Sequence, residues 1–386
     1  MSADPRSLLI LANCGRAMAE SALRGGYAVT VLDGFCDQDT LAVADCWPLS
    51  QAFPQLDTDA FIEEMASLFP EGLAGVVYGA GLEGAPRLLE RLSARYPLFG
   101  NAPRVLDLLR NPRRFISLLN RLRIPHPEVL FTPPYSAQPR AWLIKRAGSC
   151  GGQGVAWFDR NHAVSDSACY YQRYLEGRVM SVLFIADGER HRTLGYNRLA
   201  FPSSNAPAPF LYSGAIAQAS LPGSQRRRLE RIVEKLVGEL GLRGVNSIDF
   251  IVNDRGLFVL DLNARPTATL ELYEHLLSDG WITHHIRACQ GSLPVLPLLG
   301  STAAYGHRIV YAPRIVDIPL SMAWPDWVKD RPSAGASIAE GQPLCSVFAD
   351  GAEADQVEAR LQACQEEILR RLSAPMEQSE SRRMAV

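Results

Sequence analysis

The 386-residue sequence lacks the features of several large protein classes. No apolar run approaches the roughly 20 residues that a helix needs to cross a bilayer, and no apolar leader segment is evident. The charge is balanced, with 39 basic and 41 acidic residues, which argues against a broad nucleic-acid surface. We therefore expect a soluble protein of the cytoplasm with neither a nucleic-acid nor a membrane partner.

Paired cysteine motifs and the common nucleotide fingerprints are also missing. The eight cysteines are scattered and none forms a Cys-x-x-Cys pair, so the sequence indicates neither a zinc knuckle nor a disulfide framework. This pattern is typical of a reducing compartment. A complete G-x-G-x-x-G is absent after the first predicted strand, and the glycine-rich segment in the middle of the chain is not a Walker A motif.

The N-terminal hundred residues have the alternation of an α/β domain. Apolar runs at residues 7–12 and 27–32 flank a short predicted helix at 17–24, and a further strand is expected at 74–78. Such a βαβ opening implies a parallel sheet whose ligands lie at the carboxyl ends of the strands. Apolar residues then recur at helical spacing from 103 to 123, where Asn-Pro at 111 and 112 is expected to divide two helices.

The most informative stretch is Asp-Leu-Asn-Ala-Arg at the end of an apolar run. Asp261 and Asn263 are two residues apart, so on a strand both side chains point to the same face, and Arg265 follows them there. Asp249 ends the preceding run and could lie opposite, with residues 253–256 as the turn of a hairpin. Two carboxylates and an amide oxygen on one face suit Mg²⁺, and the arginine could meet a phosphate.

A lysine and a glycine-rich loop form the second element. Lys145 ends a predicted strand at 141–145, and residues 148–154 read Gly-Ser-Cys-Gly-Gly-Gln-Gly. Small residues let backbone N–H groups approach phosphate oxygens, and the lysine adds a positive charge. The alternative is a flexible hairpin tip at the surface.

A third element is the segment Tyr-Tyr-Gln-Arg-Tyr-Leu-Glu-Gly at residues 170–177. An extended backbone here could offer amide and carbonyl groups to an adenine edge, and Glu176 could accept hydrogen bonds from ribose hydroxyls. An ordinary strand and turn is the alternative, and only the lysine upstream and the aspartates downstream favour the nucleotide interpretation.

The order of these elements resembles the ATP-grasp superfamily of ATP-dependent carboxylate ligases, over roughly residues 7–300. The resemblance implies an α/β (α+β) fold with an N-terminal parallel α/β domain, a two-lobed core and a small C-terminal domain. The expected divisions are an N-terminal domain at 1–100, a helical connector at 101–125, a lid subdomain at 126–185, a catalytic subdomain at 186–300, a C-terminal domain at 301–375 and a disordered tail at 376–386.

The resemblance also implies roles for matching residues. Lys145 would hold the phosphates of ATP, the glycine loop would cover them, and the hinge would line the adenine and ribose. The implied nucleotide-binding residues are Lys145, Ser149, Gly151, Gly152, Gly154, Gln172, Arg173, Tyr174, Leu175 and Glu176.

The implied metal ligands are Asp249, Asp261 and Asn263, which would hold one or two Mg²⁺ ions; Mn²⁺ could substitute. Arg265 would be catalytic together with Lys145, because it would stabilise the transferred phosphoryl group or an acyl phosphate. Small-molecule carboxylate and amine substrates are expected, and a homodimer is the assembly common in such ligases.

Three positions depart from the family pattern. The second acidic ligand is usually Glu, whereas this chain has Asp261, whose shorter arm could alter the metal geometry. Arg146 follows the strand lysine where Pro is common. The connector often carries a second ATP-binding lysine, which either Arg110 or Arg113 could replace.

The resemblance implies ATP-dependent amide formation through an acyl phosphate. The segments around Asp249 and Asp261 are similar to ligases of one-carbon cofactor assembly, such as the tyramine–glutamate ligases of methanofuran synthesis. Residues 332–348 resemble the C-terminal domain of the carboxylase-like branch, so carboxylation through carboxyphosphate is a second hypothesis. A nucleotide-binding protein without turnover is a third, motivated by Asp261 and the missing connector lysine.

Substrate-binding residues are harder to assign from the sequence. Arg198 and the loop at 203–205 are candidates before the catalytic strands, and Thr267 and Thr269 are candidates just after them. Residues 79–83 follow a parallel strand, where a site of the N-terminal domain would be expected. Simple turn chemistry is the alternative for each of these segments.

Overall fold

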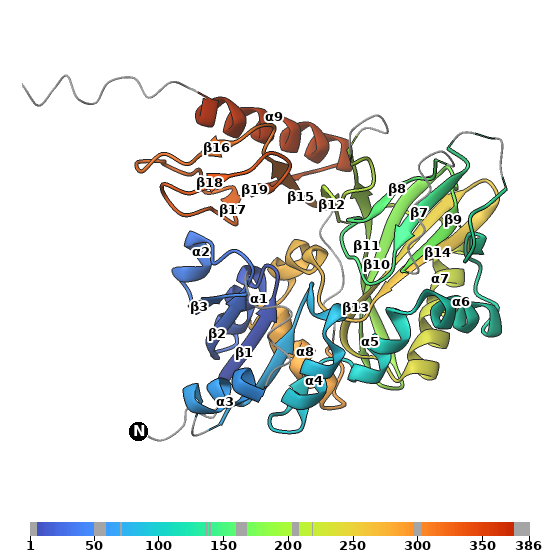
Figure 1. Ribbon diagram of the computed structural model, residues 1–386, viewed down its shortest axis with the longest axis horizontal. Helices are drawn as coiled ribbons and strands as arrows, with labels where there is room; N and C mark the ends of the chain where they lie inside the picture. Colours follow the sequence, from blue (N-terminus) through green and yellow to red (C-terminus); the bar gives the residue numbers. More distant parts are fainter. Residues whose placement is uncertain are drawn as a thin grey trace, which may run out of the picture.

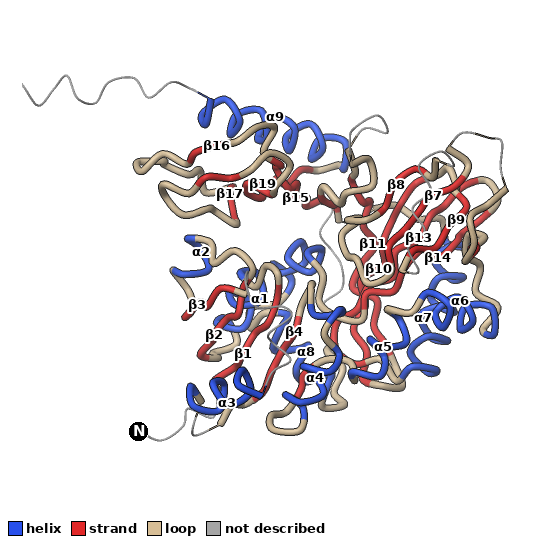
Figure 2. Tube along the Cα trace, in the orientation of Figure 1, coloured by secondary structure: helices blue, strands red, loops and turns tan. Residues whose placement is uncertain are grey.

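The computed structural model describes residues 6–49, 59–69, 72–135, 138, 140–159, 168–202, 208–217, 219–295 and 303–373. The predicted substrate loop at 203–205 and the predicted tail at 376–386 lie outside these ranges. Figures 1 and 2 show the arrangement: the N-terminal sheet lies beside the antiparallel strands β7–β11, β13 and β14, and in this view the C-terminal strands and the last helix lie above the N-terminal sheet. In the part of the chain that is described, no helix combines the length and apolar character needed to cross a membrane.

The N-terminal domain is built on a five-stranded parallel sheet with the order β3-β2-β1-β4-β5. Residues 8–12 of the central strand are all completely buried, as expected for a parallel strand covered on both faces. The predicted parallel sheet is therefore confirmed. Its strands are β1 (Ser7–Ala12), β2 (Ala28–Asp33), β3 (Asp45–Pro48), β4 (Gly75–Tyr78) and β5 (Leu98–Phe99).

Short helices connect these strands, and two more form the connector. Asn111 caps the second connector helix by accepting a hydrogen bond from the N–H of Arg114 at 3.2 Å, and Pro112 occupies its first turn. The predicted division into two helices at Asn-Pro is therefore confirmed. The helices are α1 (Arg16–Arg24), α2 (Gln38–Leu41), α3 (Asp59–Leu68), η1 (Leu82–Gly84), α4 (Pro86–Ser93), α5 (Pro103–Leu109) and α6 (Pro112–Arg121).

A small antiparallel sheet follows, with the order β6-β9-β7-β8, and we call it the lid sheet because it lies in the predicted lid subdomain. It carries the predicted lysine strand and the predicted hinge strand as direct neighbours, with Lys145 paired to Tyr170. The strands are β6 (Val129–Leu130), β7 (Trp142–Arg146), β8 (Val155–Trp157) and β9 (Cys169–Arg173).

The largest sheet has eight strands in the order β14-β13-β10-β11-β12-β15-β19-β17, and all neighbouring pairs are antiparallel. Pairing of β12 with β15 carries this sheet from the middle of the chain into the C-terminal segment. Its strands are β10 (Arg178–Asp187), β11 (His191–Ala200), β12 (Gly214–Ile216), β13 (Arg243–Asn253), β14 (Gly256–Asn263), β15 (Ala304–Tyr311), β17 (Val328–Lys329) and β19 (Pro343–Gly351).

The remaining elements cover this sheet or extend its C-terminal end. The amphipathic α7 buries apolar residues such as Leu229, Leu236 and Leu240, which belong to the main hydrophobic core. Likewise α9 buries Val357 and Leu361 against β15 and β19. These elements are α7 (Gly223–Leu240), η3 (Ala268–Leu276), α8 (Trp281–Cys289), β16 (Val316–Asp317), β18 (Ser337–Ile338) and α9 (Ala354–Ser373).

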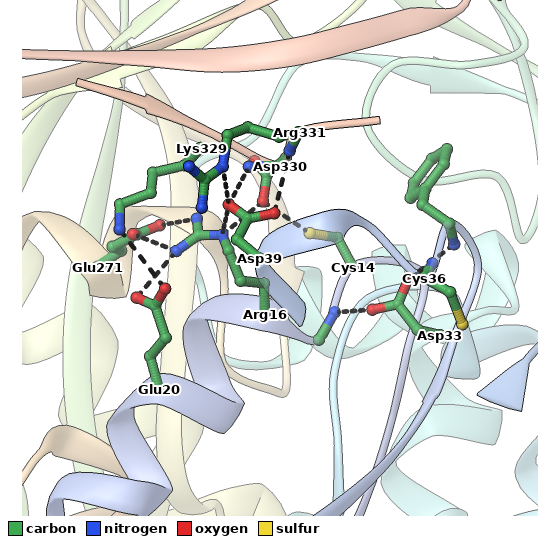
Figure 3. Close-up of polar contacts among 12 residues, drawn as sticks. Cys14, Arg16, Glu20, Asp33, Cys36, Asp39, Glu271, Lys329, Asp330 and Arg331 are labelled. Atoms are coloured by element: carbon green, nitrogen blue, oxygen red, sulfur yellow. Dashed lines mark hydrogen bonds and ion pairs between the residues drawn. The ribbon is translucent and has the colours of Figure 1, made fainter. Parts of the chain in front are cut away.

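A buried arginine joins three parts of the molecule, as Figure 3 shows. Arg16 of α1 is 1% exposed and donates two hydrogen bonds of 2.7 Å to Glu271 of η3. Its Nε donates to Asp330, after β17, at 2.7 Å. Asp39 of α2 accepts hydrogen bonds from the backbone N–H groups of Asp330 and Arg331 at 2.8 and 3.0 Å. The N-terminal domain is therefore attached to both later parts of the chain through buried charges.

Candidate functional site

The candidate site is centred on the hairpin of β13 and β14. Asp249 pairs with Asp261, and Asn253 pairs with Gly256 at the turn, so the predicted hairpin with its turn at residues 253–256 is confirmed. The pairing shifts between Asp249 and Phe250. This β-bulge leaves Leu260 unpaired and places Asp261 directly opposite Asp249. Regular pairing from the turn would place Leu260 opposite Asp249, so the two carboxylates come together because of this bulge in the hairpin.

Hydrogen bonds fix the polar end of this hairpin. Asn263 donates from Nδ2 to the Asp249 carboxylate at 3.1 Å and to the Ser247 hydroxyl at 3.3 Å. Its amide oxygen accepts from Arg265 Nη2 at 3.3 Å. Burial and the neighbouring Asp261 raise the pKa of the Asp249 carboxyl to about 7. A divalent cation would relieve the repulsion between the carboxylates, so this oxygen-rich donor set fits Mg²⁺ or Mn²⁺.

A glutamate of the N-terminal domain holds Arg265 in place. Arg265 is 6% exposed and its Nε forms an ion pair with Glu83, which lies in η1. Glu83 also accepts a hydrogen bond from the backbone N–H of Gly81 at 2.7 Å. The segment at 79–83, which we considered for a site of the N-terminal domain, therefore reaches the hairpin. An arginine held in this way is oriented before any ligand binds.

Lys145 lies on the neighbouring small sheet. Its Nζ donates to the side-chain oxygen of Gln172 at 3.2 Å and lies 5.8 Å from the ring centroid of Tyr170. Burial opposes the charged form, but Tyr170, Asp261 and Asp249 together hold the pKa of Lys145 above its usual value. The lysine is therefore fully charged at neutral pH and faces the carboxylates of the hairpin.

These groups share one cavity of about 570 Å³, a volume within the range of small-molecule sites. The hairpin, the lid sheet, the connector and the loop before β12 all contribute to its walls. The predicted site residues that line it are Lys145, Ser149, Gly151, Gly152, Gln172, Tyr174, Leu175, Asp249, Asp261, Asn263 and Arg265.

The sequence around this cavity matches a known protein family. The family model of the ATP-grasp domain matches residues 111–269, which include the second connector helix, the lid sheet and the hairpin. This chain contains an ATP-grasp domain.

Individual relatives are distant. The arginine-specific large chain of carbamoyl phosphate synthase from Bacillus subtilis is 22% identical over 219 residues, which cover 50% of this chain and 20% of the relative. Tyramine–L-glutamate ligase from Methanocaldococcus jannaschii is 24% identical over 145 residues, or 36% of this chain and 39% of the relative. The chain therefore spans less than half the length of either curated relative.

A solved structure shares the fold of nearly the whole chain. The L-amino acid ligase from Bacillus licheniformis superposes with a TM-score of 0.69, covering 94% of this chain and 97% of that one at 15% identity. This identity establishes the fold alone, and the expected fold class is confirmed.

Three of the implied nucleotide residues of the ATP-grasp domain do not line the cavity. Gly154 lies at the base of the loop, where its carbonyl accepts from the N–H of Arg146 at 3.0 Å. The guanidinium of Arg173 lies 5.6 Å from the ring centroid of Trp142. Glu176 is exposed, and its backbone carbonyl accepts a hydrogen bond from Asn253. The ribose role that the resemblance implied for Glu176 stays a prediction.

The connector arginines differ in position. Arg110 lines the cavity and its Nη1 lies 3.4 Å from the carbonyl of Gly84. Arg113 does not line this cavity, and its guanidinium stacks 4.1 Å from the ring centroid of Phe131. Geometry therefore favours Arg110 as the replacement for the connector lysine of the family.

The substrate candidates divide in the same way. Thr267 and Thr269 both line the cavity, and their hydroxyl groups lie 2.9 Å apart. Arg198 does not line it; this side chain instead forms ion pairs with Asp355 and Glu358 of α9 at 3.3 and 3.4 Å. A structural role is therefore the better interpretation of Arg198.

The glycine-rich loop at residues 148–154, which we call the lid loop after its predicted role, contacts the segment before β12, a contact that sequence reasoning missed. The N–H of Tyr212 donates to the carbonyl of Gly151 at 2.9 Å. Trp157 packs against Tyr174 and Phe210, with ring centroids 4.7 and 5.0 Å apart. These aromatic residues also line the cavity. Aromatic residues in β8 and in the Pro-rich segment were the only sequence signal for this contact.

A second group of possible metal ligands lies beside Arg16. Ligand atoms of Cys14, Asp37 and Asp330 are within 4.8 Å of one another, and this is the sole such group in the described ranges. Asp330 is already engaged, because it accepts hydrogen bonds from Arg16 and from the Cys14 thiol at 2.7 and 3.3 Å. We assign no ion to this group.

Proposed function

We propose that this protein is an ATP- and Mg²⁺-dependent ligase that joins a small-molecule carboxylate to an amine through an acyl phosphate. The observation that carries the proposal is the convergence of Asp249, Asp261, Asn263, Arg265 and Lys145 on one cavity of an ATP-grasp domain. Opposed carboxylates suit a magnesium nucleotide, and the two cations suit the negative charge of a transferred phosphoryl group.

Each group of residues has a distinct role in this proposal. Asp249, Asp261 and Asn263 hold the metal, which neutralises charge on the phosphates when it is bound. Lys145 and the lid residues Ser149, Gly151 and Gly152 hold and cover the phosphates, with Gln172, Tyr174 and Leu175 beside the base. Arg173, Gly154 and Glu176 are implied by the resemblance alone. One or two Mg²⁺ ions are accommodated by this donor set, and Mn²⁺ is expected to substitute.

The chemistry has two balanced steps. A carboxylate oxygen of the acid attacks the γ-phosphorus of ATP, the bond to the bridging oxygen breaks, and ADP leaves. The amine then attacks the acyl carbon, the carbon–oxygen bond to phosphate breaks, and the nitrogen loses a proton as the amide forms. Arg265, oriented by Glu83, lies where it can stabilise the charge on the phosphoryl group in both steps.

The finer features of the proposal come from the relatives. Amino-acid addition in the assembly of a methanofuran-type cofactor is our favoured reaction, since one curated relative is a tyramine–L-glutamate ligase. We also infer a cytoplasmic protein that works as a homodimer on small molecules, as such ligases commonly do. Carboxylation through carboxyphosphate would replace this reaction if bicarbonate, rather than an amino acid, were required for ADP release.

The test is a screen for ADP release with MgATP over carboxylates and amines, followed by the mass of the product. We expect ADP formation that requires both an acid and an amine, and a product whose mass equals their sum minus water. Asp261→Ala should lower this rate by about a hundredfold or more, because a metal ligand is lost. Asp254→Ala, in the exposed turn of the same hairpin, is the matched control and should keep the rate.

ATP binding without acceptor-stimulated ADP release over the whole panel would contradict the proposal and favour a nucleotide-binding protein without turnover. Equal rates in the Asp261→Ala and Asp254→Ala variants would also contradict it, since the hairpin carboxylate would then have no part in catalysis.

A further inference from the structure

A second cavity, of about 790 Å³, adjoins the first and is rich in arginine. Arg110, Pro112, Ala147 and Tyr170 line both cavities, so the two cavities adjoin at these residues. We call the second cavity the arginine pocket and define it by Arg87, Arg110 and Arg113. It lies between the start of α4, the junction of α5 with α6, and the lid sheet.

The positive charge of the arginine pocket is not balanced by nearby acids. In the described ranges, no carboxylate forms an ion pair with Arg87, Arg110 or Arg113. One acid, Asp107, lines the pocket, but its carboxylate forms an ion pair of 2.6 Å with Arg114 instead. The whole chain carries a formal charge of −2, so three uncompensated guanidinium groups in one cavity are a local excess.

The backbone adds to this charge. Pro86 and Pro112 begin α4 and α6 and both line the pocket, so the amino-terminal ends of two helices open into it. The first turn of α4 has no side-chain cap, and because Pro86 has no N–H and Leu89 bonds to the Ala85 carbonyl, the N–H groups of Arg87 and Leu88 are the ones left for a ligand. Unpaired N–H groups and the helix dipole both favour an anion at such an end.

Apart from Arg110, which lines both cavities, the nucleotide does not account for this pocket. Lys145, Gln172 and the hairpin carboxylates, which suit the phosphates and their metal, line the other cavity. Arg87 and Arg113 line the arginine pocket alone. Since the cavities adjoin at Arg110, a molecule whose reacting group lies near Arg265 could extend a second group toward Arg87.

We propose that the arginine pocket binds a second anionic group of the substrate, a carboxylate or a phosphate that does not itself react. The inference rests on the proposed ligase function for its link to turnover, whereas anion binding is tested separately. Arginine is suited to this role because its planar guanidinium can form paired hydrogen bonds with either group. The substrate class is then an acid or amine with an additional negative charge.

The experiment compares Arg87→Gln and Arg113→Gln with Arg104→Gln. Arg104 is an exposed residue of α5 that lines neither cavity, so its substitution makes the same change in charge outside the pocket. In the first arm, calorimetry measures binding of O-phosphoserine and of serine to protein saturated with MgADP. Wild type and Arg104→Gln should prefer phosphoserine, and the pocket variants should lose about tenfold in affinity for it.

The second arm measures ADP release with matched pairs of substrates, such as glutamate with glutamine and phosphoserine with serine. The anionic member of a pair should have the lower KM in wild type. This advantage should fall by about tenfold in Arg87→Gln and Arg113→Gln, while the KM for ATP stays unchanged.

The outcomes separate this inference from the proposed function. A preference for phosphoserine that depends on Arg87 and Arg113, in a protein that releases no ADP with any pair, would support the pocket and contradict the ligase. ADP release with no preference for anionic substrates would overturn the pocket and leave the ligase. A rise in the KM for ATP alone would also overturn it, because the arginines would then serve the nucleotide.

Discussion

At the scale of single residues, the hairpin side chains show which contacts of the site could be predicted from the sequence and which could not. The hairpin that carries Asp249 and Asp261 could be predicted because two apolar runs flank a four-residue turn, but the β-bulge that places the two aspartates opposite each other could not. The partner of Arg265 could not be predicted in this way. Glu83 is 182 positions away, and only the docking of the N-terminal domain brings the two together.

Asp37 makes a testable contribution to stability. It is 7% exposed, and burial together with Asp330 and Asp33 raises the pKa of its carboxyl from 3.8 to about 8. The folded protein then holds a proton that the unfolded chain releases above about pH 4. Its contribution to stability is therefore fully present below pH 4 and is lost as the pH rises toward 8.

Asp37→Asn removes this titration. We expect the variant and wild type to differ little near pH 4 and the variant to be more stable at pH 8, by at least about 1 kcal/mol. Thermal unfolding at both pH values measures the difference, and Asp45→Asn on the exposed part of β3 is the control. A pH-independent difference between Asp37→Asn and wild type would show that Asp37 does not titrate in this range.

At the scale of elements, the lid loop shows that contact with a neighbouring segment distinguishes two residues of the same type and similar backbone conformation. Gly148 and Gly152 both have positive φ values, of 75° and 79°. A Cβ on Gly152 would collide with the backbone carbonyl of Phe210, whereas a Cβ on Gly148 would meet nothing within 4 Å. The two glycines therefore share a backbone requirement, but only one is in close contact with the segment before β12.

This difference gives a matched pair of variants. Gly148→Ala and Gly152→Ala should both cost about 1–2 kcal/mol for the left-handed backbone. Only Gly152→Ala should also prevent the lid from reaching Phe210, so its kcat/KM for ATP should fall at least about tenfold below that of Gly148→Ala. Steady-state kinetics of the two variants decides this, and equal losses would contradict closure of the lid onto this segment.

Helices, strands and the hairpin between adjacent strands were the features of the fold that the sequence predicted best. The parallel N-terminal strands, the two connector helices and the β13–β14 hairpin follow from local apolar patterns and turn residues. The contact of Gly151 with Tyr212 was not predictable, because it joins two irregular segments from different sheets. Periodicity carries no information on how such loops meet.

The molecule as a whole depends on the buried network of Arg16. Its bonds to Glu271 and Asp330 span 255 and 314 positions of sequence, so no local pattern could reveal them. The network attaches the N-terminal domain, which supplies Glu83, to the rest of the chain. Stability of this attachment is therefore linked to the geometry of the candidate active site.

Arg16→Met should be strongly destabilising, because it leaves Glu271 and Asp330 buried without a cation. Breaking a buried ion pair in this way costs about 3–5 kcal/mol. Arg24→Met is the control, since Arg24 is 40% exposed and its ion pair with Glu274 should contribute less than about 1 kcal/mol. Calorimetric unfolding should show a transition lowered by several degrees in the first variant alone; similar losses in both would contradict the role of Arg16.

Transfer of oxygen from the acid to phosphate tests the proposed chemistry most directly. The reaction is run with MgATP, an amine and a carboxylate labelled with ¹⁸O in both oxygens, and the released phosphate is analysed by mass. An acyl phosphate requires that the attacking carboxylate oxygen leave with the phosphate, so each phosphate should carry one ¹⁸O. Phosphate without label, formed at the rate of the amide, would contradict phosphorylation of the carboxylate.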